Sequence, residues 1–271
     1  MIAGLLAVGF AGAHAQQKEL EPVEGQPGKD IVFQTTPDAV VHRMLQMAHT
    51  TKADYVIDLG AGDGRIVIAA ARDFGARSLG VEYDSNLVAL ARTKARMAGV
   101  SDRTQFVQGD LFAYDFSAAT VLTLYLEEAL NVRLRERVLA LRPGTRVVSH
   151  AFRMGDWAPD ERATEDDREL FLWIVPERVA GTWDFAFRRA EVQKLHAQLM
   201  QRFQEISADR RHQEIPGDLD GRMRGRDIAF NYRDVRGGLL RCAGRVDRER
   251  MEGRCRIAGA ADFTWSALRR P

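Results

Sequence analysis

A glycine-rich loop with the sequence DLGAGDG occupies residues 58–64 and has the composition of a ligand-binding turn. Alternate glycines let a backbone pass very close to a bound ligand. The third glycine lies one position earlier than in a dinucleotide fingerprint, and the terminal Gly-Lys-Ser/Thr of a phosphate loop is absent. Asp58 and Asp63 make the loop acidic, whereas a phosphate at a helix N-terminus requires donors and positive potential. We therefore predict a partly cationic ligand, contacted by Asp58, Gly60, Ala61, Gly62, Asp63 and Gly64.

Two further acidic residues follow the next two predicted strands. Glu82 lies 24 residues after Asp58, where a carboxylate can accept both hydroxyls of a ribose. Asp110 and Leu111 follow the third strand, where the acid can meet an adenine amino group. Each acid alone is more often a helix cap or a solvated loop residue. Together with the loop they predict S-adenosylmethionine (SAM), which carries a sulfonium and an α-ammonium group and no phosphate.

The loop and the two acids resemble the class I SAM-dependent methyltransferases: DLGAGDG looks like motif I of that family, Glu82 like its ribose acid and Asp110 like its adenine acid. More narrowly, the chain resembles the small protein-lysine methyltransferases that modify the ATP synthase c subunit and the adenine nucleotide translocase. The runs that carry this resemblance, between residues 31 and 159, are VFQTTPDAVVHRML, DLGAGDGRIVIAAA, GDLF, TLYL, LRPGTRVVSHAF and MGDW. It implies a seven-stranded sheet, SAM as the cofactor and a protein with an accessible lysine as the partner, membrane-associated if it is like the targets of that branch.

Acceptor chemistry is expected at the end of the fourth strand, where residues 123–128 read TLYLEE. Methyl transfer from a sulfonium is an in-line displacement with a neutral leaving group, so alignment can supply most of the catalysis. The segment has no Asp/Asn-Pro-Pro-aromatic motif and no cysteine, which argues against adenine N6, glutamine amide and cytosine C5 as acceptors. We expect Tyr125 to line the methyl channel and Glu127 or Glu128 to order an amine. For both glutamates the alternative is the solvated start of a helix, where acids suit the helix dipole.

His150 ends the fifth predicted strand and is the remaining candidate base, because the pKa of histidine lies near working pH. The alternative is a structural histidine that bonds a neighbouring loop. Residues 156–157, Asp-Trp, are expected at the far rim of the site, with simple packing as the alternative for the tryptophan. By the family resemblance, a lid over the cofactor is expected from Phe33, Thr35 and Thr36. Thr36 also fits as the N-cap of a helix that has Pro37 at its first position.

Five short β-branched or apolar runs provide the scaffold for these residues. They cover residues 55–59, 78–82, 104–108, 120–124 and 146–150, and a sixth run covers 169–175. Helices are expected from Pro37 and from near Arg65, Ser85 and Asn131. Strands that alternate with helices of roughly 10 to 15 residues predict an α/β fold, here a Rossmann-like parallel sheet with helices on both faces. Ligands of such sheets bind beyond the carboxyl ends of the strands, where the loop and the acids lie.

After Pro176 the apolar residues recur with period two, which predicts an antiparallel meander curled toward a small barrel. The alternating runs cover residues 183–187, 228–232, 240–246, 251–257 and 263–267. Residues 192–206 fit one face of a helix and also a strand, of which we favour the strand. The run GRMRGRDIAF resembles bacterial proteins that join a methyltransferase domain to a lipocalin-like β unit.

The chain has two cysteines, Cys242 and Cys255, which excludes a cysteine-rich metal site and a disulfide framework, and we predict no metal. If residues 247–250 form a hairpin loop, the two cysteines face each other on one side of the ribbon. We predict that they are neighbours, and that they are oxidised if and only if the chain is exported. Two reduced, buried apolar residues are the alternative in a cytosolic protein.

The N-terminal run MIAGLLAVGFAGAHA ends in a small-x-small pattern before Gln16. This pattern predicts a signal peptide over residues 1–15, with a buried helix as the alternative. A linker over residues 16–30, a methyltransferase domain over 31–176 and an antiparallel β domain over 177–271 follow. A signal peptide implies an exported, periplasmic protein, whereas cytosolic synthesis of SAM favours the cytoplasm.

Composition narrows the remaining possibilities. The 271 residues are 45% hydrophobic and 28% charged, with a net charge of +1, so no global field points to nucleic acid or to a membrane. Residues 181–271 hold 19 basic and 13 acidic side chains, and residues 1–180 hold 20 and 25, which indicates two units. No apolar run is long enough to span a bilayer. We expect a monomeric enzyme that methylates a protein lysine. The alternatives are a small-molecule methyltransferase and a non-catalytic SAM-binding protein whose β domain binds lipid or protein.

Overall fold

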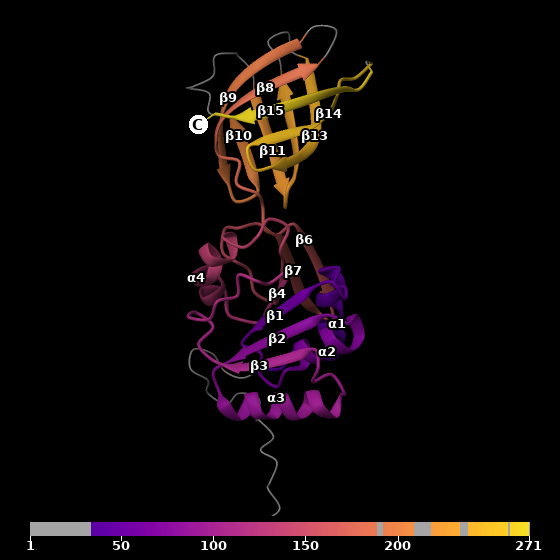
Figure 1. Ribbon diagram of the computed structural model, residues 1–271, viewed down its shortest axis with the longest axis vertical. Coiled ribbons are helices and arrows are strands. Elements are labelled where there is room, and N and C mark those ends of the chain that lie inside the picture. The colour runs from indigo at the N-terminus through magenta and orange to yellow at the C-terminus, as the bar shows by residue number, and fades with distance from the viewer. Residues whose placement is uncertain (1–33, 189–191, 209–217, 234–237, 260, 271) are drawn as a thin grey trace, which may run out of the picture.

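The structure, a computed structural model, describes residues 34–188, 192–208, 218–233, 238–259 and 261–270. The expected signal peptide, the linker and Phe33 lie outside these residues. The chain forms a sheet with helices, followed by a separate barrel at the other end of the long axis of the molecule (Figure 1). Among the described residues, no helix is long and apolar enough to cross a bilayer.

The first domain contains a seven-stranded sheet in the order β3-β2-β1-β4-β5-β7-β6. Its strands are β1 (Tyr55–Leu59), β2 (Arg77–Glu82), β3 (Thr104–Gln108), β4 (Val121–Leu124), β5 (Arg146–His150), β6 (Glu161–Glu165) and β7 (Arg168–Ile174). Strands β1 to β5 are parallel, and β7 is antiparallel to both β5 and β6. The strand order reverses beside β1, which is where ligands bind in open α/β sheets. The expected Rossmann-like sheet, with the seven strands that the resemblance implied, is confirmed.

In the part of the chain that the structure describes, four helices cover this sheet: α1 (Asp38–Met47), α2 (Arg65–Phe74), α3 (Ser85–Met97) and α4 (Glu128–Leu139). Alternate strand residues serve opposite faces, so that Val148 packs with α1 and α2 and Val147 packs with α4. Two predicted helix starts were wrong. Helix α1 begins at Asp38 with Pro37 as its N-cap, because the hydroxyl of Thr36 is engaged elsewhere. Helix α4 begins at Glu128, three residues before Asn131.

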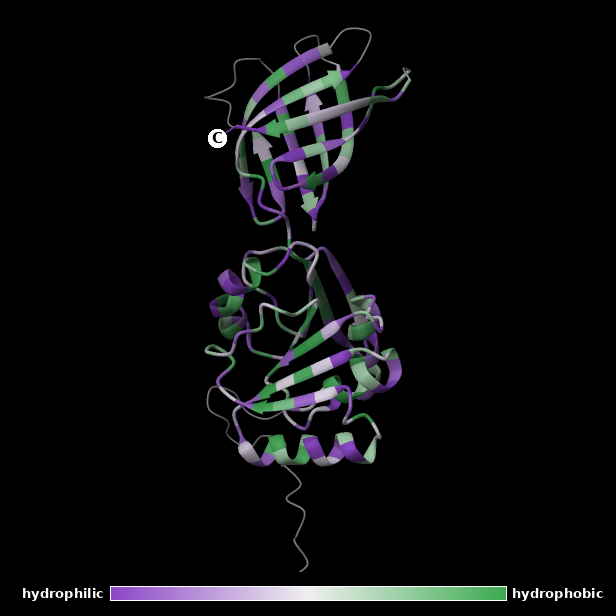
Figure 2. Ribbon diagram, in the orientation of Figure 1, coloured by the Kyte–Doolittle hydropathy of each residue, from purple (hydrophilic) through white to green (hydrophobic). Residues whose placement is uncertain are grey.

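The second domain is a closed barrel of eight antiparallel strands in the order β10-β11-β12-β13-β14-β15-β8-β9. They are β8 (Gly181–Arg188), β9 (Val192–Arg202), β10 (Glu205–Ala208), β11 (Asp218–Arg224), β12 (Asp227–Arg233), β13 (Leu239–Asp247), β14 (Arg250–Arg256) and β15 (Phe263–Arg269). Residues 192–206 are therefore strand, as we favoured. Hydrophobic and hydrophilic residues alternate along the strands (Figure 2), and the inward set includes the aromatic residues Trp183, Phe185, Phe187, Phe230, Tyr232 and Trp265.

The β13–β14 hairpin has the predicted register. Cys242 faces Cys255 and Val246 faces Met251, and one further pair, Asp247 with Arg250, shortens the turn to two residues. The cysteines form a disulfide with their Cα atoms 4.0 Å apart, and both are buried in the barrel. The prediction that they are neighbours is confirmed.

Candidate functional site

The glycine loop connects β1 to α2 with three left-handed residues, Gly60, Gly62 and Gly64, whose φ angles are 80°, 54° and 81°. Gly64 directly precedes α2. A Cβ atom there would lie 2.7 Å from Cε1 of Phe106 and 2.8 Å from Cβ of Ala91. Both backbone conformation and packing therefore require glycine at this position, and the loop stays close to the sheet edge. Ala61 is buried in the same loop.

Glu82, at the end of β2, is held by two backbone donors. The N–H of Gly62 donates to Oε2 at 2.8 Å, and the N–H of Asp84 donates to Oε1 at 2.9 Å. A carboxylate offers about four acceptor positions, so each oxygen keeps a lone pair for a further donor. The structure thus brings the predicted ribose acid against the predicted loop and fixes its orientation.

Asp58, the last polar residue of β1, is 3% exposed and accepts a hydrogen bond from Thr123 Oγ1 at 2.7 Å. Burial raises the pKa of Asp58 from 3.8 to about 7, and the nearby carboxylates of Glu82 and Asp63 add to this rise against the Thr123 hydrogen bond. The buried carboxyl group therefore gains from any cation that binds beside it.

The sequence predicted that the carboxylate of Asp63 would contribute negative charge to the ligand site, but in the structure Arg65 and Lys94 neutralise it. Arg65 Nε and Nη2 donate to its two oxygens at 3.0 and 2.9 Å, and Lys94 Nζ donates to Oδ2 at 2.7 Å. Burial raises the pKa of Asp63, but Arg65 and Lys94 lower it by more than burial raises it. The pKa of Asp63 therefore lies below its usual value. Asp63 thus ties α2 and α3 together, and the acid left for a cationic ligand is Asp58.

Asp110 lies after β3 in a tight turn. Its Oδ1 accepts from the N–H of Phe112 at 2.9 Å, and its carbonyl accepts from the N–H groups of Ala113 and Tyr114. Asp110 and Leu111 are half-buried at the edge beyond β2 and β3. The structure therefore places the predicted adenine acid at the same sheet edge as Glu82.

The acceptor end of the site combines the side chains of Tyr125 and His150 with the segment before α1. The rings of Tyr125 and His150 stack with centroids 3.9 Å apart. His150 Nδ1 lies 3.1 Å from Thr36 Oγ1, and Tyr125 Oη donates to Gln34 Oε1 at 3.0 Å. The carbonyl of Thr36 also accepts from Arg65 at 2.9 Å. Residues 34–36 thus join the cofactor loop to the ends of β4 and β5.

His150 is buried, and its Nε2 atom has no hydrogen-bond partner among the described residues. Burial lowers the pKa of His150 to about 4, with a smaller contribution from Arg168. The imidazole is therefore neutral near pH 7 and is a weak proton acceptor. An unpaired buried nitrogen calls for a partner, which a bound ligand or water supplies.

Glu127 and Glu128 lie at the start of α4 and are exposed. Glu127 is the N-cap residue: its carbonyl accepts the first backbone hydrogen bonds of the helix, from the N–H groups of Leu130 and Asn131, and its side chain makes no cap bond. Both glutamates therefore lie at the solvated start of a helix, which was the alternative for them. Their carboxylates are exposed two and three residues after Tyr125 in the sequence.

The loop after β5 supplies residues that the sequence did not single out. Ala151 has φ 63°, and the N–H of Phe152 donates back to the carbonyl of His150 at 2.8 Å, a strained three-residue turn. This turn brings the Phe152 ring to 6.1 Å from that of Tyr125. Asp156 is 53% exposed and pairs with Arg135, whereas Trp157 is buried and packs, which was the alternative for that residue. Two polar residues of α4, Asn131 and Arg135, hold this loop through its backbone carbonyls, and the sequence analysis singled out neither for this role.

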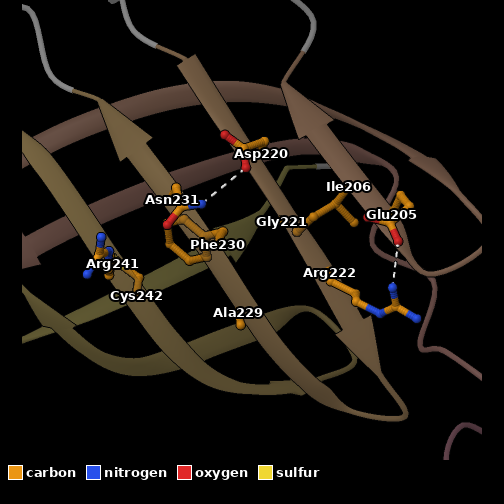
Figure 3. A pocket seen from close by; sticks show the side chains of 10 residues that line it. All are labelled: Glu205, Ile206, Asp220, Gly221, Arg222, Ala229, Phe230, Asn231, Arg241 and Cys242. Atoms are coloured by element: carbon orange, nitrogen blue, oxygen red, sulfur yellow. Dashed lines mark hydrogen bonds and ion pairs between the residues drawn. The ribbon is translucent and has the colours of Figure 1, made fainter. Parts of the chain in front are cut away.

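A separate hollow of about 410 Å³ lies on the outside of the barrel over β10 to β13 (Figure 3). Four of its side chains form two pairs, Arg222 with Glu205 at 3.0 Å and Asn231 with Asp220 at 3.2 Å. Arg222 also donates to Asp160 of the first domain at 2.8 Å. It shares no residue with the cofactor loop or the acceptor end. Among the described residues, no group of three or more His, Cys, Asp or Glu is arranged to hold a metal.

Comparison with known proteins gives matches that are all named methyltransferases and that differ in the acceptor they name. The family described as the ANTKMT methyltransferase domain matches residues 58–161. A Saccharolobus islandicus protein named protein-lysine N-methyltransferase is 38% identical over 153 residues, 54% of this chain and 95% of that protein. A Xenopus laevis protein, named as the lysine N-methyltransferase of the ATP synthase c subunit, is 32% identical over 44% of this chain and 53% of that protein, so the chain spans about half of this relative. A solved structure named RNA methyltransferase from Salinibacter ruber, in complex with S-adenosyl-L-homocysteine, is 50% identical with a TM-score of 0.53 and covers 54% of this chain and 96% of that one.

Proposed function

The chain belongs to the family of SAM-dependent methyltransferases, and on that premise we propose that it transfers the methyl group to the side-chain amine of a protein lysine. The observation that carries this proposal is the acceptor end. There an aromatic wall of Tyr125 over a buried neutral His150 stands next to the exposed carboxylates of Glu127 and Glu128. Relatives named as protein-lysine methyltransferases support the same acceptor.

The site residues fit SAM, which when bound supplies an electrophilic methyl group on a sulfonium. We assign Glu82 to the ribose hydroxyls and Asp110 to the adenine amino group. The left-handed glycines of residues 60–64 leave room for the backbone to approach the ligand. Asp58 gives the cationic end a buried carboxyl group with a raised pKa, and Thr36 closes the site from the segment before α1.

The acceptor lysine must lose a proton before it can attack. Its reference pKa is near 10.4, so at pH 7 only about one amine in a few thousand is a free nucleophile. The exposed carboxylates of Glu127 and Glu128 attract the ammonium group, and the apolar wall beyond them favours the neutral amine. With a pKa of about 4, His150 does not store the proton. We assign it to orienting Tyr125 and Thr36, and the proton leaves to solvent along Glu127.

RNA and small amines are the two rival acceptors, and the experiment tests each of them separately. The Salinibacter ruber protein is named an RNA methyltransferase, and small amines also fit an apolar channel. The purified protein is incubated with methyl-labelled SAM and, separately, with membrane proteins, soluble proteins, RNA and small amines. Mass spectrometry should locate the label on lysine side chains. Label found only in RNA or small molecules refutes the lysine proposal, and SAM binding without transfer to any pool points to the non-catalytic alternative.

A further inference from the structure

The two-residue turn between β9 and β10, Phe203 and Gln204, is one of the contacts between the barrel and the methyltransferase domain. Arg222 and Arg224 of β11 also pair with Asp160 and Glu161. Gln204 is 1% exposed, and both ends of its amide are paired across the domain boundary. Trp157 Nε1 donates to its Oε1 at 2.7 Å, and its Nε2 donates to the carbonyl of Ala158 at 2.7 Å. The backbone carbonyl of Gln204 accepts from the N–H of Met223 in β11, so the backbone of this residue is fixed to the barrel while its side chain binds the other domain. Buried polar groups are costly to leave unpaired, which makes this a firm attachment.

Phe203 adopts a conformation that needs support. Its φ is 55°, whereas a bulky side chain rarely has a positive φ and glycine is favoured there in two-residue hairpin turns. The ring stacks on Trp157 with centroids 5.8 Å apart and an interplanar angle of 18°. The guanidinium groups of Arg135 and Arg202 lie 5.1 and 5.6 Å from the ring centroid. Backbone strain persists where surrounding contacts hold it, and here those contacts come mainly from the methyltransferase domain.

The loop that this turn contacts, residues 151–158, is held from its other side by α4. Asn131 Nδ2 donates to the carbonyls of Phe152 and Arg153 at 3.4 and 3.2 Å. Arg135 donates to the carbonyl of Met154 and pairs with Asp156, which also pairs with Arg202 of the barrel at 2.5 Å. The loop is therefore clamped between α4 and the barrel, and it begins with the turn that sets Phe152 beside Tyr125.

We propose that the Phe203–Gln204 turn is a positioning element for the acceptor wall, so that the barrel takes part in acceptor binding without touching the cofactor. This role rests on the proposed function, in which the acceptor lysine enters past the aromatic wall of Tyr125 and His150. The barrel strands lie outside residues 58–161, and 54% of this chain already covers 95% of the Saccharolobus islandicus relative. The barrel is thus an addition to a methyltransferase domain, placed against the loop that bounds its acceptor end.

Steady-state methyl transfer by the full-length protein tests this role. Gln204→Met keeps the side-chain volume and removes both hydrogen bonds, and Phe203→Gly relieves the backbone and removes the stacked ring. Each should raise the KM for the protein acceptor about tenfold, while kcat and the Kd for SAM from calorimetry stay within about twofold of the parent. Phe203→Tyr keeps the ring and should restore the parent KM.

A matched control is available at the β13–β14 turn. Arg248 also has a left-handed φ, 53°, and makes no interaction with the methyltransferase domain among the described residues. Arg248→Gly should leave the acceptor KM unchanged. In hydrogen exchange, Gln204→Met should deprotect residues 151–158 and leave the glycine loop, residues 58–64, as in the parent.

An unchanged acceptor KM in both folded variants, with melting curves like the parent's, overturns the positioning role. A parent protein that methylates no lysine overturns the proposed function instead. In that case the same variants are measured with whichever acceptor carries the label, and unchanged exchange of residues 151–158 then refutes the clamp itself.

Discussion

At the scale of single residues, Glu82 does two jobs with one carboxylate. It receives the backbone N–H groups of Gly62 and Asp84, and we assign its remaining lone pairs to the ribose. Glu82→Ala should weaken SAM binding by about 1.5 to 3 kcal/mol, since charge-assisted hydrogen bonds are lost and the loop loses its tether. Calorimetry gives the Kd. Glu136→Ala, at an exposed glutamate of α4, is the control, and an unaltered Kd in the Glu82 variant would show that another group holds the ribose.

The raised pKa of Asp58, about 7, makes stability depend on pH. Between about pH 4 and 7 the folded protein keeps a proton on Asp58 that the unfolded chain has released, so the free energy of unfolding falls as pH rises through this window. Asp58→Asn should remove that part of the slope, and Asp102→Asn, at an exposed acid, should not. Denaturant titrations at several pH values measure it, and equal slopes in the parent and Asp58→Asn would contradict the assignment.

The same carboxyl group should couple SAM binding to a proton. A cation beside Asp58 favours the charged form, so binding below about pH 7 should release a proton, and affinity should rise with pH from about 5.5 to 7.5. Calorimetry in buffers of different ionisation enthalpy counts the released proton. Asp58→Asn should bind with no such release; a release that survives in this variant assigns the proton to another group.

At the scale of elements, the loop between β1 and α2 depends on how closely α3 and β3 approach it. Gly64 and Gly99 both have left-handed φ angles, 81° and 69°, but only Gly64 has neighbours within reach of a Cβ atom. Gly99→Ala should cost about 1 to 2 kcal/mol of stability from backbone strain alone. Gly64→Ala should cost about 1 to 3 kcal/mol more, from overpacking against Phe106 and Ala91, and should also weaken SAM binding. Thermal melts compare the two, and equal losses would mean that the helix and strand move aside freely.

The elements that could be predicted from the sequence are those with a strong apolar period. Strands β1, β2, β4 and β5 are short, mostly buried runs, and β3 has one buried residue, Phe106. The barrel strands that carry the inward aromatic residues alternate inward and outward residues. Strand β6, with the sequence ERATE, lies at the sheet edge without a buried face, so no periodicity marked it. Strand β10 has four residues, and β11 places a glycine at an inward position. Their pairing partners, not their own composition, make them strands.

The site was predictable to the same extent. Acids at successive strand ends can be read from sequence spacing, because parallel strands end at one edge of a sheet. The pairing of Asp63 with Lys94 and the contact of Trp157 with Gln204 join residues far apart in the chain, and no local pattern encodes them. The start of helix α4 was likewise placed three residues too late, because its N-cap residue, Glu127, is not one of the usual capping types and makes no side-chain cap bond.

At the scale of the whole molecule, the disulfide between Cys242 and Cys255 joins neighbouring barrel strands with a sequence separation of 13. Closing a loop of this size should stabilise the barrel by about 3 kcal/mol. We expect the melting temperature of the parent to fall on addition of a reductant. The Cys242→Ala/Cys255→Ala variant should melt lower than the oxidised parent and show no response to reductant. A parent that melts identically with and without reductant would contradict a stabilising bridge.

We propose that the chain reaches an oxidising compartment, since structural disulfides persist there and the N-terminal run has a cleavage-site pattern. Thiol-blocking mass spectrometry of protein taken from periplasmic and cytoplasmic fractions checks this. We expect a mature chain that begins near Gln16 and carries no blockable thiol in the periplasmic fraction. A full-length, fully reduced protein confined to the cytoplasm would refute export.

The closure of the barrel sets an order of events during synthesis. Strand β15 pairs with β8, so the last strand of the domain completes a ring that its first strand began. Until β15 has left the ribosome, β8 and β14 both present open edges, which are templates for pairing with other chains. The last strand of the methyltransferase sheet, β7, precedes the barrel in the sequence, so this sheet can form while the barrel is still being synthesised. A nascent chain stalled before Phe263 would therefore carry a complete methyltransferase sheet together with an open barrel sheet whose edge strands β8 and β14 can pair with other chains.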